Sequence, residues 1–249
     1  MLSIVIPTRN EANALPRTLP HTISRARNAA FELIVSDCDS VDATREIAAQ
    51  LGAKVIRGGR NRADALNRGA KITRGDVLLF LHADTLLPND FVRRIDRALL
   101  NPRIVGGAFD FMFAPHPRQH VLHRVSLMIV VLCNRFRFRW SRNFYGDQAI
   151  FVRRDVFDRL GGFAAIELLE DLRFSNAMNR VGKTAILSPP VQTSARRFIH
   201  RGVLRQLFRD MMLLVGDSLG MRPRTRWARY NQFNHRTDIV TFRDSVDGS

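Results

Sequence analysis

Cysteines and long apolar runs are scarce in this chain. Cys38 and Cys133 are the only cysteines among 249 residues, so no disulfide framework is expected, and no Cys/His group has zinc-ligand spacing. The longest strongly apolar run, residues 127–133, is far shorter than the ~20 residues that a membrane-spanning helix needs. No basic segment followed by a long apolar stretch begins the chain, which argues against a signal peptide. We therefore expect a cytoplasmic protein, either soluble or peripheral at the inner face of the cell membrane.

Lysine is almost absent, although the chain is strongly basic. Of 39 basic residues only Lys54, Lys71 and Lys183 are lysines, which leaves 36 arginines, and with 23 acidic residues the net charge is +16. The guanidinium group binds phosphates and carboxylates well, so an anionic partner or membrane surface would explain the excess. A genome rich in arginine codons would explain it equally well, because the arginines are scattered along the chain. Both explanations stay open.

Short β-rich runs alternate with helical patterns over the first hundred residues, an order typical of a doubly wound sheet covered by helices. Several of the runs are apolar on both faces, as strands of a buried parallel sheet are. Asn89 is expected to cap the last of these helices. The predicted strands are residues 3–6, 32–36, 54–56 and 77–81, and the predicted helices are residues 12–27, 42–51, 62–72 and 90–100.

A strand rich in phenylalanine follows. Phe109, Phe111 and Phe113 occupy alternate positions, which predicts a strand with one aromatic face. Further along the chain, residues 149–152 are a predicted strand, and residues 119–136 and 170–180 are predicted helices.

The C-terminal part has an amphipathic pattern. Apolar side chains recur at helical spacing over residues 203–219, with Arg205, Arg209 and Asp210 on the opposite side. Such a helix either packs on its own domain or lies on a membrane surface. The last dozen residues hold few apolar groups and are expected to fray. We therefore divide the chain into a main domain (1–200), a helical extension (201–235) and a flexible tail (236–249).

Polar segments follow three of the predicted strands. Ligands of a doubly wound sheet bind beyond the carboxyl ends of its strands, so these segments are candidates for one site. A strand-ending proline, a helix cap or a turn would explain each segment singly, but three at one edge favour a function. The segments are residues 7–11 (Pro-Thr-Arg-Asn-Glu), 37–42 (Asp-Cys-Asp-Ser-Val-Asp) and 82–85 (His-Ala-Asp-Thr).

These segments resemble those of the inverting family 2 glycosyltransferases, which have the GT-A fold. The resemblance runs from residue 3 to about residue 182. It implies a Rossmann-like α/β/α sandwich with a mixed, mainly parallel sheet. It also implies transfer of a sugar from a nucleotide-diphosphate donor to an acceptor hydroxyl, with a UDP-linked donor as the family's tendency.

The first two segments are similar to the nucleotide loops of that family. Asp37 takes the place of the aspartate that binds the nucleobase, and Arg62 is placed to meet the base or the phosphates. Cys38-Asp39 stands where the family usually has Asp-Gly. The nucleotide-binding residues that the resemblance implies are Pro7, Thr8, Asn10, Glu11, Asp37 and Arg62.

The third segment takes the position of the family's metal-binding DXD motif, with His82 in place of the first aspartate. It resembles a bacterial subgroup of small transferases in which His-Ala-Asp-Thr is usual. Mg²⁺ or Mn²⁺ bridging the diphosphate oxygens stabilises the charge that develops on the leaving group. Such hard ions keep several waters, so one direct protein ligand, Asp84, can suffice. His82 is either a ligand or close neighbour of the metal, or a packed histidine at a strand end.

Glu170 and Asp171 begin the predicted helix over residues 170–180. In the resembled family the second acid of this pair is the general base, so Asp171 is expected to take the proton of the acceptor hydroxyl, with Glu170 as the alternative. Acids favoured in the first turn by the helix dipole would also explain the pair.

Two further pairs are weaker candidates. Asp147 and Gln148 either orient the sugar or acceptor, or form a structural turn before a strand. Arg196 and Arg197 either reach the diphosphate oxygens from a closing loop, or are solvated surface residues.

Two other functions stay open. A sugar nucleotidyltransferase shares the broad fold, but residues 7–11 lack its glycine-rich loop. A basic polyanion-binding protein without catalysis would bind duplexes in a salt-sensitive way, although no motif for specific nucleic-acid binding is present. Many relatives of the resembled family act on lipid or lipid-linked acceptors, so an acceptor of that kind and an anionic membrane surface are the expected further partners.

Overall fold

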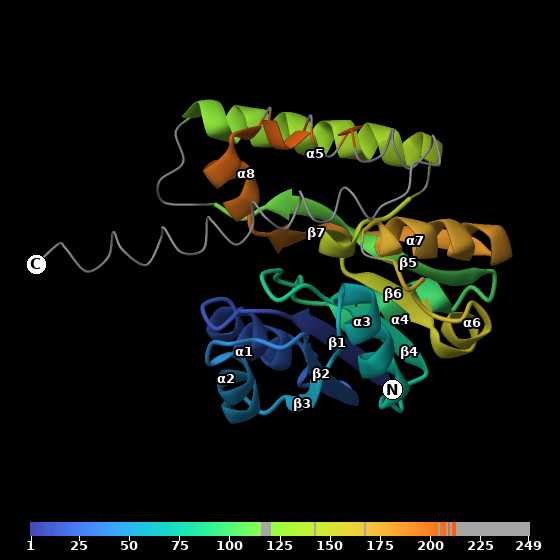
Figure 1. Ribbon diagram of the computed structural model, residues 1–249. Coiled ribbons are helices and arrows are strands. Elements are labelled where there is room, and N and C mark those ends of the chain that lie inside the picture. Colours follow the sequence, from blue (N-terminus) through green and yellow to red (C-terminus); the bar gives the residue numbers. More distant parts are fainter. Residues whose placement is uncertain are drawn as a thin grey trace, which may run out of the picture.

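The computed structural model describes residues 1–115, 121–141, 143–166, 168–203, 205–207, 209 and 211–212. The strands are β1 (Leu2–Thr8), β2 (Phe31–Asp37), β3 (Lys54–Arg57), β4 (Val77–Phe80), β5 (Ile104–Phe113), β6 (Ile150–Arg153) and β7 (Lys183–Thr193). They form one sheet with the order β3-β2-β1-β4-β6-β5-β7 (Figure 1). Because β6 runs antiparallel to β4 and β5 while the other neighbours are parallel, the sheet is mixed and mainly parallel, as expected.

The central strands are buried on both faces. In β1, Ile4 and Ile6 face one helical layer and Val5 faces the other, and none of the three is exposed. A strand covered on both sides reads as a continuous apolar run, which is why the sequence pattern located these strands correctly.

Helices form the two outer layers of the sandwich. They are α1 (Leu15–Ala26), α2 (Thr44–Gln50), α3 (Arg62–Lys71), α4 (Phe91–Leu99), α5 (Val121–Ser141), α6 (Arg154–Arg159), α7 (Glu170–Val181) and α8 (Arg196–Arg201), with a short 3-10 turn η1 (Gly146–Gln148). α1, α2 and α4 pack on the Ile4 face, whereas α3, α6 and α7 pack on the Val5 face. α5 lies above the edge of the sheet beside α8 (Figure 1).

Two local expectations differ from the structure. Asn89 is not the cap of α4: the cap position is Asp90, whose carboxylate accepts a bond from the Arg94 side chain (2.8 Å) instead of a backbone N–H. β7 was not expected from the sequence, because Pro189 and Pro190 interrupt its pattern. Prolines are tolerated there because β7 is an edge strand.

Only part of the predicted C-terminal helix lies among the described residues. Of the helix expected over residues 203–219, residues 203, 205–207, 209, 211 and 212 are helical. The remaining residues of that helix and the tail over 236–249 lie outside the described residues. In the described part of the chain, no helix is long and apolar enough to cross a membrane.

Candidate active site

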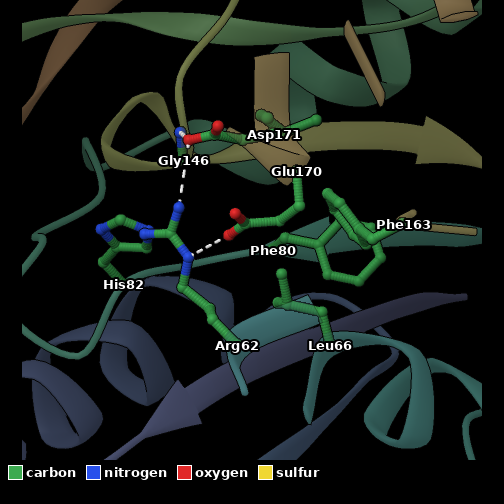
Figure 2. Close-up of a pocket in the computed structure, with 9 residues that line it drawn as sticks. Arg62, Leu66, Phe80, His82, Gly146, Phe163, Glu170 and Asp171 are labelled. Atoms are coloured by element: carbon green, nitrogen blue, oxygen red, sulfur yellow. Dashed lines mark hydrogen bonds and ion pairs between the residues drawn. The ribbon is translucent and has the colours of Figure 1, made fainter. Parts of the chain in front are cut away.

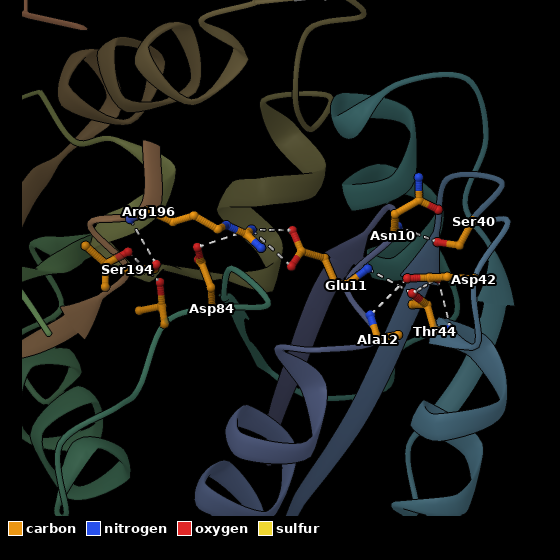
Figure 3. A network of polar contacts seen from close by, with 11 residues as sticks. Asn10, Glu11, Ala12, Ser40, Asp42, Thr44, Asp84, Ser194 and Arg196 are labelled. Carbon is orange, nitrogen blue, oxygen red and sulfur yellow. Dashed lines mark hydrogen bonds and ion pairs between the residues drawn. The ribbon is translucent and has the colours of Figure 1, made fainter. Parts of the chain in front are cut away.

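The ends of β1 and β2 hold two loops that are bonded to each other. The Asn10 N–H donates to Ser40 Oγ (2.9 Å), and the Val41 N–H donates back to Asn10 Oδ1 (2.9 Å). The Glu11 N–H donates to Thr44 Oγ1 (2.9 Å), as Figure 3 shows. Because β1 and β2 are parallel neighbours, their carboxyl ends bring segments 30 residues apart into this contact. Two of the three polar segments thus form one surface.

Asp37 lies where the two loops meet, and its side chain is fully buried. Its carboxylate accepts bonds from Thr8 Oγ1 (3.0 Å) and from the Ser40 N–H (2.9 Å), and Arg45 lies 3.8 Å away. In this arrangement Asp37 and Thr8 join the two loops, and the neighbouring Pro7 is half-buried at the end of β1.

Among the described residues, four residues other than glycine have left-handed backbone conformations, and all four belong to segments at this edge of the sheet. They are Asn10 (φ 56°), Asp39 (φ 53°), Ala149 (φ 52°) and Leu169 (φ 65°). Such conformations are costly for most side chains, and they concentrate at functional sites. Asp39 also explains the Cys-Asp departure noted above: the position needs a positive φ, which glycine adopts freely and aspartate tolerates.

Arg62, at the start of α3, reaches between three other site residues (Figure 2). Its Nε donates to Glu170, and its Nη2 lies 3.2 Å from Asp171 Oδ2. Its Nη1 lies 3.1 Å from His82 Nε2. One guanidinium group therefore joins the start of α3, the end of β4 and the start of α7, residues up to 109 positions apart.

Asp171 is held by the backbone as well. Its Oδ2 accepts the Gly146 N–H (2.7 Å), and its Oδ1 accepts the Leu172 N–H (2.8 Å). A Cβ at position 146 would lie 2.5 Å from His82 Nε2, so the His82 ring would have to move to admit any other residue there. The turn that precedes β6 thereby fixes the orientation of the Asp171 carboxylate.

Glu170 is 2% exposed and lies beside Asp171. Burial raises the pKa of the Glu170 carboxyl above its ordinary value; the Arg62 guanidinium lowers this pKa in part, and the Asp171 carboxylate raises it further. The first turn of α7 favours negative charge through the helix dipole. Two adjacent buried acids that share one cation are typical of a functional site.

The pocket around this cluster is almost filled. Apolar side chains close one side of it, and the remaining space is only about 10 Å³, at most one water molecule. The lining residues are Arg62, Leu66, Phe80, His82, Gly146, Ile150, Phe163, Glu170 and Asp171.

A second pocket, of about 210 Å³, lies at the same edge of the sheet and contains Asp84. Arg196 Nη2 lies 3.9 Å from Asp84 Oδ2 and 3.3 Å from Glu11 Oε1, so it joins the β4 segment to the β1 loop (Figure 3). Arg17 on α1 also lines this pocket. Cation-binding and phosphate-binding candidates are therefore neighbours, although Asp84 and Arg196 are 112 positions apart in the sequence.

His82 and Asp84 belong to different pockets. The structure places His82 beside Arg62, whereas Asp84 lies beside Arg196. Among the described residues, no group of three His, Cys, Asp or Glu side chains would hold a metal ion. A hard cation at Asp84 would take its other ligands from substrate phosphates and water, which is usual for Mg²⁺.

The remaining candidates have different surroundings. Gln148 is buried: its Nε2 donates to the Phe109 carbonyl (3.2 Å) and its Oε1 accepts the Tyr145 N–H (3.0 Å). These bonds are those of the structural turn that the sequence left open as an alternative. Asp147 lies in the same turn, half-buried. Arg197 lies on α8, and its side chain is outside the described residues.

The profile of one protein family, described as Glycosyl transferase family 2, matches residues 3–168. The match spans well over half of the chain. The chain belongs to glycosyl transferase family 2.

Curated relatives of this family 2 chain are longer than it is. A PGL/p-HBAD biosynthesis glycosyltransferase of Mycobacterium bovis is 32% identical over 181 residues, 66% of this chain and 63% of the relative. A 4,4'-diaponeurosporenoate glycosyltransferase of Staphylococcus haemolyticus is 31% identical over 152 residues, 54% of this chain and 38% of the relative. The family 2 chain thus spans less than two thirds of either relative.

Solved structures share the fold of this family 2 chain. A mannosyltransferase of Pyrobaculum calidifontis, in complex with GDP-Man and Mn²⁺, matches 76% of this chain and 54% of its own at 22% identity, with a TM-score of 0.54. Glucosyl-3-phosphoglycerate synthase of Mycobacterium tuberculosis, in complex with Mn²⁺, UDP-glucose and phosphoglyceric acid, matches 75% of this chain and 68% of its own at 22% identity, with a TM-score of 0.51. The expected GT-A fold is confirmed.

The Arg62 cluster in this family 2 chain predicts a pH-dependent loss of stability. Removing Arg62 raises the pKa of Glu170 further, because Arg62 is the cation that lowers it. A carboxyl whose pKa is higher in the folded chain than in the unfolded chain favours folding at low pH, and this contribution is lost as the pH rises through the folded pKa. Arg62→Met should therefore cost more stability at pH 8 than at pH 5.

We expect a cost of about 2 kcal/mol at pH 8, reduced from the usual cost of an unpaired buried charge because Arg62 is 35% exposed. Thermal melts at both pH values would measure it. Arg68→Met is the matched control on the same helix, since the Arg68–Asp64 pair is exposed. Equal losses for the two variants, or a loss at Arg62 that does not grow with pH, would contradict the prediction.

Proposed function

We propose that the chain transfers a sugar from a nucleotide-diphosphate donor, UDP-linked, to an acceptor hydroxyl with inversion at the anomeric carbon. The observation that carries the proposal is the meeting of two polar groups at one sheet edge: the carboxylate pair around Arg62, and Asp84 with Arg196. Membership of family 2 and the GT-A fold support it. The structural relatives named above were solved with GDP-Man or UDP-glucose bound.

The donor would lie across the joined loops of β1 and β2, with its diphosphate toward the second pocket. Asp84 would hold a divalent cation, Mg²⁺ or Mn²⁺, which neutralises charge on the departing diphosphate. The side chain of Asp84 is 28% exposed in a pocket large enough for phosphate groups, which fits this donor set. Arg196 would bind a phosphate oxygen, exchanging its contact with Glu11 for the substrate.

Asp171 would act as the general base. The acceptor oxygen forms a bond to the anomeric carbon as the bond to the diphosphate oxygen breaks, and the hydroxyl proton passes to Asp171 Oδ2. A single displacement of this kind inverts the configuration. The Gly146 and Leu172 N–H groups hold the carboxylate in one orientation, which supports this assignment over Glu170.

Arg62 would have to move for the reaction to proceed. Its Nη2 lies on the same Asp171 oxygen that the hydroxyl needs, and the pocket has no room for a sugar while it stays. The donor phosphates offer Arg62 a competing bidentate partner. Donor binding would therefore free the base before the acceptor enters, and Glu170 would keep its contact with the arginine.

The expected cytoplasmic location, lipid or lipid-linked acceptor and association with an anionic membrane are proposals as well. The association with an anionic membrane is supported by the net charge of +16 and by the exposed apolar side chains of α5.

A thermal-shift panel tests the proposed function. UDP-, GDP- and dTDP-sugars are added with and without Mn²⁺, and a UDP-sugar with Mn²⁺ is expected to raise the melting temperature most. At a hundredfold excess over Kd, binding adds about 2.7 kcal/mol, or roughly 5–10 °C for a chain of this size. No shift with any nucleotide sugar, together with a salt-sensitive shift by duplex DNA, would instead indicate a polyanion-binding protein.

A further inference from the structure

α5 is apolar on two opposite sides. Leu127, Val130 and Val131 are buried against the rest of the protein. A second set of apolar side chains on the same helix is between 51% and 67% exposed: Val125, Met128, Ile129, Leu132 and Phe136. An amphipathic helix of a water-soluble domain would carry polar groups there, so the exposed set needs a separate explanation.

The exposed side chains form one continuous strip, which we call the α5 stripe (Val125, Met128, Ile129, Leu132 and Phe136). Their spacing of three and four residues places them along one side of the helix. α5 lies at the outer boundary of the molecule in Figure 1. A contiguous apolar surface of this kind marks a binding surface, whereas single exposed apolar residues do not.

A neighbouring helical segment extends the apolar surface. Val203 and Leu207 pack with Leu127 and Val130 of α5. Further along that segment, Met211 and Met212 are 54% and 51% exposed. Two adjacent helical segments therefore present apolar side chains.

The sequence around the stripe is rich in arginine. Residues 111–146 include six arginines and no aspartate or glutamate. Arg135, on α5 itself, is half exposed while it pairs with Asp110 at 2.6 Å. The described surface of α5 is therefore apolar along the helix, and the sequence that surrounds it carries net positive charge.

We propose that the α5 stripe docks on an anionic lipid surface, with α5 lying parallel to the membrane. Apolar side chains would enter the boundary of the acyl chains, and the arginines would meet anionic headgroups. A second copy of the chain is a poorer occupant, since both copies would bring the same positive charge to the contact. This names the surface for the membrane association proposed above, and it holds or fails separately from sugar transfer.

The position of α5 in the chain gives the docking a consequence for the site. Ser141 ends α5, and Gly146, whose N–H holds Asp171, follows five residues later. Docking would thus place the proposed base close to the lipid boundary. If the proposed function is correct, the acceptor hydroxyl belongs to a lipid that stays in the membrane during transfer.

Vesicle flotation tests the docking surface without any catalytic readout. The full chain is mixed with vesicles of phosphatidylcholine and phosphatidylglycerol, or of phosphatidylcholine alone, at low and at high salt. Wild-type protein is expected to float with the anionic vesicles at low salt. The double variant Met128→Glu/Leu132→Glu should reduce the bound fraction at least about tenfold. The control Leu100→Glu/Val181→Glu adds the same charge at exposed apolar positions elsewhere and should float as the wild type does.

Cys133 offers a second readout on the otherwise unchanged chain. It is exposed beside Leu132, whereas Cys38 is buried, and burial raises the pKa of the Cys38 thiol to about 11. A polarity-sensitive maleimide dye should therefore label Cys133 selectively and shift to the blue on anionic vesicles.

Three results would overturn the docking proposal. They are absence of wild-type flotation at low salt with no dye shift, equal flotation of the stripe variant and the control, and a wild-type dimer in solution that the stripe variant abolishes. The nucleotide-sugar thermal shift is measured on the same variants. A thermal shift that persists when docking fails shows that the docking proposal has failed and the proposed function has not.

Discussion

Asp171→Asn is expected to lower turnover about a hundred- to ten-thousandfold, the usual contribution of a general base. Asparagine has nearly the same size, and its single oxygen still accepts one of the Gly146 and Leu172 N–H groups, but its amide cannot take the hydroxyl proton. Donor binding should stay nearly unchanged. Turnover is measured as release of nucleoside diphosphate from the donor that gives the largest thermal shift, with water or a membrane lipid extract supplying the hydroxyl.

Two further variants separate the base from its neighbours. Asp155→Asn, at an exposed position on α6, should leave turnover and donor binding as they are. Glu170→Gln should lower turnover less than Asp171→Asn, because it removes the charge that pairs with Arg62 and not the proposed base. Turnover at the wild-type rate in Asp171→Asn, or a larger loss in Glu170→Gln, would overturn the assignment.

Asp84→Ala is expected to remove the metal-dependent part of donor binding and to lower turnover at least about a hundredfold, since charge on the departing diphosphate would lose its main stabilisation. The measurement compares the donor-induced thermal shift with and without Mn²⁺. In the wild type Mn²⁺ should enlarge the shift, and in Asp84→Ala the two shifts should be equal.

Asp158→Ala, at another exposed aspartate, is the matched control and should keep the full effect of Mn²⁺. In the described part of the chain, no group of three His, Cys, Asp or Glu side chains offers another metal site, and Asp84 is the candidate carboxylate in its pocket. The comparison of the two variants therefore tests Asp84 directly. If Asp84→Ala retains the enlarged shift, the cation is held elsewhere and the ligand assignment is wrong.

The local sequence pattern predicted most of the strands and helices. Six strands were predicted because buried parallel strands are continuous apolar runs and Phe109, Phe111 and Phe113 alternate. β7 was not predicted, because its pairing with β5 is long-range and its two prolines are typical of a loop. The cap of α4 was misassigned by one residue because Asn89 and Asp90 are both favourable cap residues and Asp90 instead pairs with Arg94.

Candidate residues were easier to predict than their partners. Topology explains why the segments after β1, β2 and β4 lie at one edge, since they follow parallel strands. No local rule, in contrast, indicates that Arg62 contacts Glu170 and Asp171 across more than a hundred residues. The sequence also did not predict that His82 and Asp84 line different pockets, because this depends on the direction of each side chain at the end of a strand.

The contact between Arg196 and Glu11 joins residues 185 positions apart and has a consequence for the order of assembly during synthesis. β1 to β4 emerge from the ribosome early and can pair at once, because their contacts lie within the first 80 residues. At translation rates of about 5–20 residues per second, Arg196 follows several seconds later. The newborn chain can therefore join the loops after β1 and β2 first, and it completes the second pocket last.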